Sequence, residues 1–148
     1  RCFGDQGSEG CTREGIGLEL DPANFTCAKP LRSAFGAVRR CTDFNTMNID
    51  ADLVHCHTWY SHFGGILAKK NYGLPLVVTV HSLEPLRPWK REQLAGGYDF
   101  SLWVEQPALE MADAIIAVPV STKQHIDRLF EVAPSREHVI HTGIDMNP

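Results

Sequence analysis

The segment from Leu53 to Gly65, LVHCHTWYSHFGG, holds three histidines, a cysteine, aromatic rings and a glycine pair within thirteen positions. Imidazole nitrogens serve as metal ligands and general bases, and a thiolate next to a base is a nucleophile. Aromatic rings beside a few polar side chains are also typical of small-molecule sites. The residues therefore allow three interpretations: a metal site, a nucleophile and base pair, or the mouth of a sugar-binding cleft.

A second group of chemically active residues lies between His81 and Gln106. Aromatic and charged residues alternate there, which suits sugar rings and phosphates. The alternative is an ordinary solvated loop whose tryptophans belong to the core. The aromatic members are Trp89, Tyr98 and Trp103, and the charged members are Glu84, Arg87, Lys90, Arg91 and Glu105.

The elements that must position these residues follow from the hydrophobic pattern. Short β-branched runs predict strands, and periodic segments with stop signals predict helices. Strands alternating with helices over short connections indicate βαβ units, so we expect an α/β fold with a Rossmann-like parallel sheet flanked by helices. The expected strands are 52–57, 75–81, 113–118 and 137–141, and the expected helices are 31–47, 62–72, 100–112 and 122–131.

Some local signals concern the ends of elements. Residues 4–28 are expected to form a loop, and residues 1–3 the tail of a fifth strand. Ser121 and Gln124 have the spacing of a capping box for the last helix. The strand, Gly-rich turn and helix that normally open a Rossmann-like domain are not found. We therefore expect a domain that is truncated at its N-terminus.

Histidines lie where the expected strands end. His57, His81 and His141 end three of the four strands, and parallel α/β sheets bind ligands beyond those ends. Along the first strand, His55 and His57 share one face while Cys56 points to the other. A nucleophilic Cys56–His57 pair is therefore badly arranged, and Cys56 is expected to pack under a helix. The pattern favours a cleft at this edge of the sheet.

The histidines of the first segment are not expected to act alike. For His55 the favoured interpretation is a buried strand residue bonded to the backbone, and for His57, nearer the rim, it is a functional one. His55, His57, His62 and His81 could converge on a metal ion. Because the spacings of zinc and non-haem iron sites are absent, no metal is expected.

Gly64 and Gly65 are expected to open the helix after the first strand. There they either admit an anion to the helix N-terminus or allow close packing of helix on sheet, and the two interpretations weigh equally. Other catalytic patterns are missing. Glu105 and Glu110 fall on different helix faces, so they form no hydrolase-type carboxylate pair, and there is no nucleophile elbow or P-loop.

The composition narrows the partners. The chain of 148 residues is enough for one domain, and its net charge of −4 without a dense basic run argues against nucleic acid. No apolar run approaches the roughly 20 residues of a membrane span. Five cysteines, an odd number without C-x-x-C spacing, indicate reduced thiols and hence a cytoplasmic protein.

Three segments carry a family resemblance: DADLVHCHTWYSHFGG, LPLVVTVHSLEPLRPWKREQLAGGYDFSLWVEQPALEMADAIIAV and HVIHTGID. In this order and spacing they resemble the N-terminal, acceptor-side domain of retaining GT-B glycosyltransferases of family 4. The resemblance is closest to the actinobacterial-type glycogen synthase group, which includes ADP-glucose-dependent maltose-1-phosphate synthases. It covers roughly residues 50–145, and residues 1–48 resemble the family only weakly.

The resemblance implies an enzyme with two Rossmann-like domains and the active site in the cleft between them. Residues 1–148 would form part of the first domain, and the donor-binding C-terminal domain is absent. The implied reaction transfers glucose from ADP-glucose to an α-glucan or to glucose 1-phosphate with retention, without metal or cofactor. The leaving phosphate oxygens assist the incoming hydroxyl. The implied partners are a nucleotide-sugar and its acceptor, and a homo-oligomer is left open.

The resemblance also assigns residues. His57 matches the family histidine that reaches the donor sugar and is the expected catalytic residue. Glu105 matches a helix glutamate expected to support the cleft. The other expected donor- or acceptor-binding residues are His81, Ser82, Glu84, Arg87, Trp89 and Lys90 on the rim, together with Gly64 and Gly65.

The sequence departs from the family pattern in several places. The Gly-rich loop that contacts the donor phosphates and the donor domain have no counterpart, so the chain alone is expected to be inactive. Pro119 and Val120 intervene where the family has serine directly, and His141 stands where asparagine is commoner. Two alternatives remain: a family-4 transferase with a UDP- or GDP-sugar donor, and a non-catalytic carbohydrate-binding α/β module.

Overall fold

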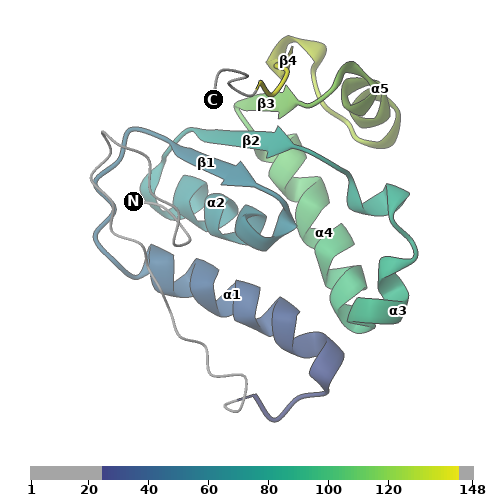
Figure 1. Cartoon of the computed structure of the whole chain (residues 1–148). Coiled ribbons are helices and arrows are strands. Elements are labelled where there is room, and N and C mark those ends of the chain that lie inside the picture. Colours follow the sequence, from purple (N-terminus) through teal and green to yellow (C-terminus); the bar gives the residue numbers. More distant parts are fainter. Residues whose placement is uncertain (1–24, 144–148) are drawn as a thin grey trace, which may run out of the picture.

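The computed structural model describes residues 25–143, so the expected strand tail at 1–3 and most of the expected loop at 4–28 lie outside the described residues. Within this range, four parallel strands form one sheet in the order β1-β2-β3-β4 (Figure 1). The α/β, Rossmann-like architecture is confirmed. The strands are β1 (Val54–His57), β2 (Leu76–Val80), β3 (Ala114–Ala117) and β4 (Glu137–Val139), and the α-helices are α1 (Arg32–Asn45), α2 (Trp59–Tyr72), α3 (Lys90–Leu94), α4 (Gly96–Met111) and α5 (Val120–Leu129).

The hydrophobic core lies between one face of the sheet and helices α2, α4 and α5. Cys56, Val78 and Ile115 point to this face from three strands, and Leu109 of α4 and Ile126 of α5 join the same buried cluster. Strands laid side by side in chain order with right-handed crossovers place their connecting helices on one face. Helix α1 packs on α2 from outside and adds a second helical layer (Figure 1).

Gly65 allows α2 to lie directly on the sheet. A Cβ atom at this position would lie 2.5 Å from Cys56 Sγ and 2.7 Å from Leu76 Cδ1. Gly64 faces α1, where a Cβ atom would lie 3.3 Å from Cys41 Sγ. Because α2 begins at Trp59, the expectation that the pair opens the helix is wrong. The glycine pair therefore does not admit an anion to the helix N-terminus. Its contacts with Cys56, Leu76 and Cys41 are those of close packing between α2 and its neighbours.

Three helices begin earlier than expected. Helix α2 begins at Trp59 instead of residue 62, α4 begins at Gly96 instead of residue 100, and α5 begins at Val120 instead of residue 122. A short helix that was not expected, α3, precedes α4, and Ala95 joins the two with a φ of 47°. The end of α2 is as expected, because Gly73 adopts a φ of 69° and its N–H donates to Lys69 O at 3.1 Å.

The expected capping box of the last helix is wrong. Helix α5 begins at Val120, one residue before Ser121, and no side chain caps its N-terminus. The preceding Val118–Pro119 peptide bond is cis. Thr122 Oγ1 donates to Val118 O at 2.8 Å across this first turn. The capping motif is recognised by spacing alone, which does not reveal that the chain enters the helix through a proline.

Replacing Gly65 with alanine should lower the free energy of unfolding by about 1–3 kcal/mol, because the added methyl group overpacks a buried contact. Gly96→Ala is the matched control, because the nearest atom to a Cβ there is Leu31 Cδ2 at an ordinary 3.7 Å. Urea unfolding followed by circular dichroism measures both variants. Equal transition midpoints for the two would contradict the packing role of Gly65.

Candidate active site

Three histidines come together at the carboxyl ends of β1 and β2. Strand pairing sets His57 opposite Thr79, so His81 follows just beyond. His57 Nδ1 lies 3.2 Å from His81 Nε2, and the two rings stack with their centroids 5.5 Å apart. The His55 ring lies 4.5 Å from that of His57. The expected gathering of histidines at this edge is confirmed for these three residues.

Two other histidines are placed elsewhere. His62 lies on α2 with 2% of its surface exposed, and burial lowers its pKa to about 3. Neither of its ring nitrogens has a hydrogen-bond partner among residues 25–143. His141 follows β4, which lies at the opposite edge of the sheet from β1. Three strand spacings, about 14 Å, therefore separate its strand from that of His57.

The electrostatic surroundings of His57 favour a neutral imidazole. Partial desolvation lowers its pKa, and positive charge on His55 or His81 lowers it further. A group whose pKa lies below its ordinary value near 6.5 is mostly uncharged at neutral pH. Because Nδ1 faces His81, Nε2 is the nitrogen left to contact a ligand. The site thus presents a neutral hydrogen-bonding group rather than a cation.

His55 differs from its expected role. Its side chain is exposed, and its Nε2 lies 2.7 Å from Thr79 Oγ1 on the neighbouring strand. The expected buried histidine bonded to backbone is therefore wrong. The reason is topological: Cys56 faces α2, so its neighbour His55 lies on the opposite face of the sheet, which α2, α4 and α5 do not cover.

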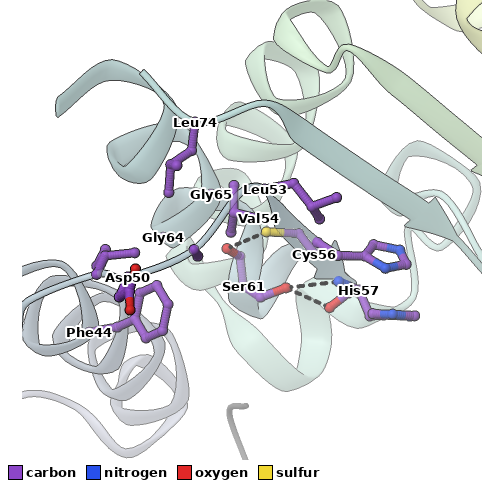
Figure 2. A pocket seen from close by; sticks show the side chains of 13 residues that line it. Phe44, Asp50, Leu53, Val54, Cys56, His57, Ser61, Gly64, Gly65 and Leu74 are labelled. Atoms are coloured by element: carbon purple, nitrogen blue, oxygen red, sulfur yellow. Dashed lines mark hydrogen bonds between the residues drawn. The ribbon is translucent and has the colours of Figure 1, made fainter. Parts of the chain in front are cut away.

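The turn between β1 and α2 holds His57 in place. The His57 N–H donates to Ser61 Oγ at 3.1 Å, and the Ser61 hydroxyl lies 2.7 Å from His57 O (Figure 2). Thr58, between strand and helix, has φ 63° and ψ 159°, a conformation that is essentially reserved for glycine. The sequence analysis missed Ser61, whose signal is a small hydroxyl residue four positions after the histidine.

Thr58→Gly tests the strain in this turn. Because glycine adopts this conformation freely, the variant should gain about 1 kcal/mol of unfolding free energy, although glycine is usually destabilising. Thr46→Gly is the control, since Thr46 has an ordinary φ of −87° and its Oγ1 donates to Asp43 O at 2.8 Å. The control should lose stability in thermal unfolding. A loss of similar size at both positions would show that Thr58 is not strained.

A buried network lies behind the rim. Glu84 and Glu105 are each 2% exposed. Lys90 Nζ pairs with Glu84 Oε1 at 2.8 Å, and Ser101 Oγ donates to Glu84 Oε2 at 3.2 Å. The Glu84 N–H donates to Glu105 Oε2 at 2.9 Å, and Tyr98 OH donates to Glu84 O at 2.9 Å. These bonds attach the segment after β2 to helix α4, so Glu84, Lys90 and Glu105 face one another inside the protein.

The remaining rim residues face solvent. Arg87 Nη1 lies 3.2 Å from Ser82 Oγ and 3.7 Å from Glu84 Oε1. Trp89 is 58% exposed and Trp103 is 63% exposed, so the core alternative for these tryptophans is wrong. Tyr98, by contrast, is 4% exposed. The structure thus brings His57, His81, Ser82 and Arg87 to the surface of one rim.

A hollow of about 460 Å³ extends along β1 and reaches His57 and Ser61 (Figure 2). Its other lining residues are mostly apolar, among them Phe44, Leu53 and Leu74. The hollow therefore adjoins the histidine cluster, but most of its lining offers few polar groups to a sugar.

The two buried cysteines among residues 25–143 are poorly suited to act as nucleophiles. Cys41 and Cys56 are free and buried, and burial raises the pKa of each thiol to about 11. Cys56 packs beneath α2, as expected. Among residues 25–143, no cluster of three or more His, Cys, Asp or Glu side chains could hold a metal ion. No helix of this range is long and apolar enough to cross a membrane.

Glu105→Gln tests the electrostatics of the network. Burial raises the pKa of Glu105 to about 8 from an ordinary 4.5, against the lowering effect of the Glu84 N–H. The folded protein therefore keeps a proton that the unfolded chain releases, so this group lowers stability as pH rises from about 4.5 to about 8. The amide keeps an acceptor oxygen without titrating. The variant should match the wild type near pH 4.5 and exceed it at pH 8.

Urea unfolding at several pH values measures this difference. Glu92→Gln, which alters an exposed carboxylate, is the control for the general effect of removing a glutamate side-chain charge. A Glu105→Gln variant that remained parallel to the wild type across the range would contradict the assignment of the proton to Glu105.

The sequence matches the family described as Glycosyltransferase Family 4 over residues 7–147. The chain is a member of glycosyltransferase family 4. The match extends over all of the described residues, including both strands that carry the histidine cluster. The four-stranded parallel sheet with its helices is the architecture of a Rossmann-like half of the GT-B fold, as expected for this family.

Several curated proteins are similar to this family-4 chain. An α-maltose-1-phosphate synthase of Mycolicibacterium smegmatis is 49% identical over 135 residues, which are 88% of this chain and 35% of that protein. One of Mycobacterium tuberculosis is 51% identical over 96 residues, 64% of this chain and 25% of that protein. A D-inositol 3-phosphate glycosyltransferase of Thermobispora bispora is 30% identical over 100 residues, 65% and 23% respectively. The chain thus spans about a third or less of the length of these relatives.

Proposed function

We propose that the complete protein containing this chain is a retaining glucosyltransferase that transfers glucose from ADP-glucose to an α-glucan or to glucose 1-phosphate. The observation that carries the proposal is the pairing of His57 Nδ1 with His81 Nε2 at 3.2 Å on the ligand-binding edge of the sheet. The proposal is supported by 49% identity to a protein named α-maltose-1-phosphate synthase. Glycogen and related α-glucan synthesis is the process we assign to it.

In this proposal His57 binds the glucose of the donor. Its Nδ1 faces His81, so Nε2 is the atom that would hydrogen-bond a sugar hydroxyl. The lowered pKa keeps the ring neutral, which suits a hydroxyl partner better than a phosphate. Ser61 fixes the backbone of His57 on both sides, through its N–H and its C=O. A group held in place before the substrate arrives costs little reorganisation during the reaction.

The rim residues supply contacts to the acceptor and the donor phosphates. Arg87 and Ser82 face solvent next to His81, and Trp89 exposes most of its ring. Glu84, Lys90 and Glu105 hold this segment against α4 and act by positioning it. No step in the proposal uses a protein nucleophile, in keeping with thiols whose pKa values are raised to about 11. The leaving phosphate oxygens assist the acceptor hydroxyl.

The wider features of the proposal rest on the family resemblance. The nucleotide would bind to a second Rossmann-like domain outside residues 1–148. Residues 1–148 by themselves would be inactive. The reaction would need no metal or cofactor beyond the nucleotide-sugar itself, and the enzyme would work in the cytoplasm. Self-association of the enzyme is left open.

One alternative has an observation in its favour. The relatives named D-inositol 3-phosphate glycosyltransferase are 30% identical or slightly more, so family-4 proteins of another specificity share this half. Such an enzyme would use a UDP- or GDP-sugar and another acceptor. The non-catalytic carbohydrate-binding module is kept as an outcome of the experiment.

The test uses the complete protein that contains residues 1–148. It is incubated with ADP-, UDP- and GDP-sugars in turn, with glycogen or glucose 1-phosphate as acceptor, and products are read by mass spectrometry. We expect transfer from ADP-glucose, lowered about a hundredfold or more in His57→Ala through loss of a preorganised contact. His138→Ala, which removes an exposed histidine of the far strand β4, should leave the rate unchanged.

Each result decides between the candidates. Transfer from another nucleotide-sugar, with the same loss in His57→Ala, supports the alternative donor. Equal rates in the two histidine variants would remove His57 from the reaction. A folded protein that binds glucan and transfers nothing from any donor would be a binding module.

A further inference from the structure

We infer that Tyr60 is a stacking platform for the glucose ring of the acceptor and helps to determine which acceptor is used. The inference rests on the transferase function proposed above. Tyr60 is the second residue of α2 and follows His57 by three positions, so it lies on the same edge of the sheet. Its side chain is 45% exposed. A half-covered aromatic ring on the first turn of the helix that follows His57 is well placed to contact a bound sugar.

The Tyr60 ring is backed by the core. It stacks on Trp59 with ring centroids 4.0 Å apart and planes at 27°. Trp59 is itself 2% exposed and contacts Phe100 edge-on at 6.2 Å between centroids. Cys41 Sγ, from α1, contacts Tyr60 O at 3.3 Å and fixes the backbone. A ring that is already immobile loses little side-chain entropy when a ligand stacks on it.

The phenol end of Tyr60 lies beside the charged rim. Desolvation raises the pKa of the Tyr60 hydroxyl, and the carboxylate of Glu84 raises it further. The guanidinium of Arg87 opposes these effects. Both groups belong to the segment that follows β2. The hydroxyl makes no hydrogen bond to another of residues 25–143, so it remains available to a ligand. Tyr60 therefore lies within electrostatic reach of the rim residues Glu84 and Arg87.

The arrangement matches a glucose ring in two ways. The axial C–H groups of a glucopyranose form an apolar face, and the face of a tyrosine ring is a large, electron-rich apolar surface. Arg87 adds a cation for any phosphate on the acceptor, because its contact with Glu84 Oε1 at 3.7 Å is looser than that of Lys90 at 2.8 Å. Both proposed acceptors, glucose 1-phosphate and an α-glucan, present a glucose ring to Tyr60. Only glucose 1-phosphate also presents a phosphate to Arg87.

The test compares Tyr60→Leu and Tyr60→Phe in the complete protein, with the acceptor concentration varied. Loss of the aromatic face in Tyr60→Leu should raise the KM for the acceptor about tenfold, with the KM for the donor unchanged. Tyr60→Phe keeps the ring and should stay close to the wild type. Thermal unfolding of each variant checks that the fold is intact.

Tyr72→Leu is the matched control. Tyr72 lies on the same helix with the same 45% exposure, but at the opposite end, roughly 18 Å away along the axis. Its hydroxyl bonds to Asn45 O, so this variant should be less stable while its KM values stay unchanged. An acceptor effect confined to Tyr60 would exclude a general response to losing a surface ring.

Two acceptors separate the sources of the sugar ring. With both glycogen and glucose 1-phosphate, Tyr60→Leu should raise the acceptor KM, whereas Arg87→Gln should do so for glucose 1-phosphate alone. An acceptor KM equal to that of the wild type in Tyr60→Leu would overturn the inference and leave the transferase function standing. If the wild type transfers nothing, the transferase function fails. The stacking role of Tyr60 is then tested by saturation-transfer NMR, which compares the binding of maltotriose and glucose 1-phosphate to the wild type and to Tyr60→Leu. Weaker binding by Tyr60→Leu supports the platform, and no difference overturns it.

Discussion

The candidate site depends on the parallel pairing of β1 with β2. The register that sets His57 beside Thr79 brings the first residue after β2, His81, to 3.2 Å from the His57 ring. A slip of one residue would turn every side chain of β1 to the other face and send His57 into the core. The same register directs Cys56 inward under α2. One set of backbone hydrogen bonds therefore determines both the buried face and the chemical edge.

The rim next to this edge is held by charge that is almost fully withdrawn from water. The Glu84 carboxylate is paired with the ammonium group of Lys90. The neighbouring side chain of Glu105 keeps its proton and stays uncharged. Burying an unpaired charge would cost several kcal/mol, so a neutral Glu105 is the less costly state. The result is a rigid support for a surface segment that contains no strand. Rigidity at Glu84 lets Arg87 and Trp89 face solvent in fixed positions.

Much of this could be predicted from the sequence, because the strands are apolar and histidines stand at the ends of β1 and β2. The pattern located the four strands and every long helix but not the short helix α3, and alternation along β1 correctly separated His57 from Cys56. It failed where the deciding contact is distant in sequence. That Gly65 meets Leu76, or that Glu84 faces Glu105, depends on tertiary packing. The exposure of His55 depends on strand order, which local pattern does not encode. Ser61 and Tyr60 were missed because neither carries a charge or a motif.

The contact between Gly65 and Cys56 has a consequence for how the sequence can change. A Cβ atom at position 65 would enter the space that the sulfur of Cys56 occupies, so the two positions share a single volume. A larger residue at position 65 would require a smaller one at position 56, and Leu76 would also have to yield. Substitutions at these sites should be strongly non-additive. Related sequences should therefore vary at the two positions together or not at all.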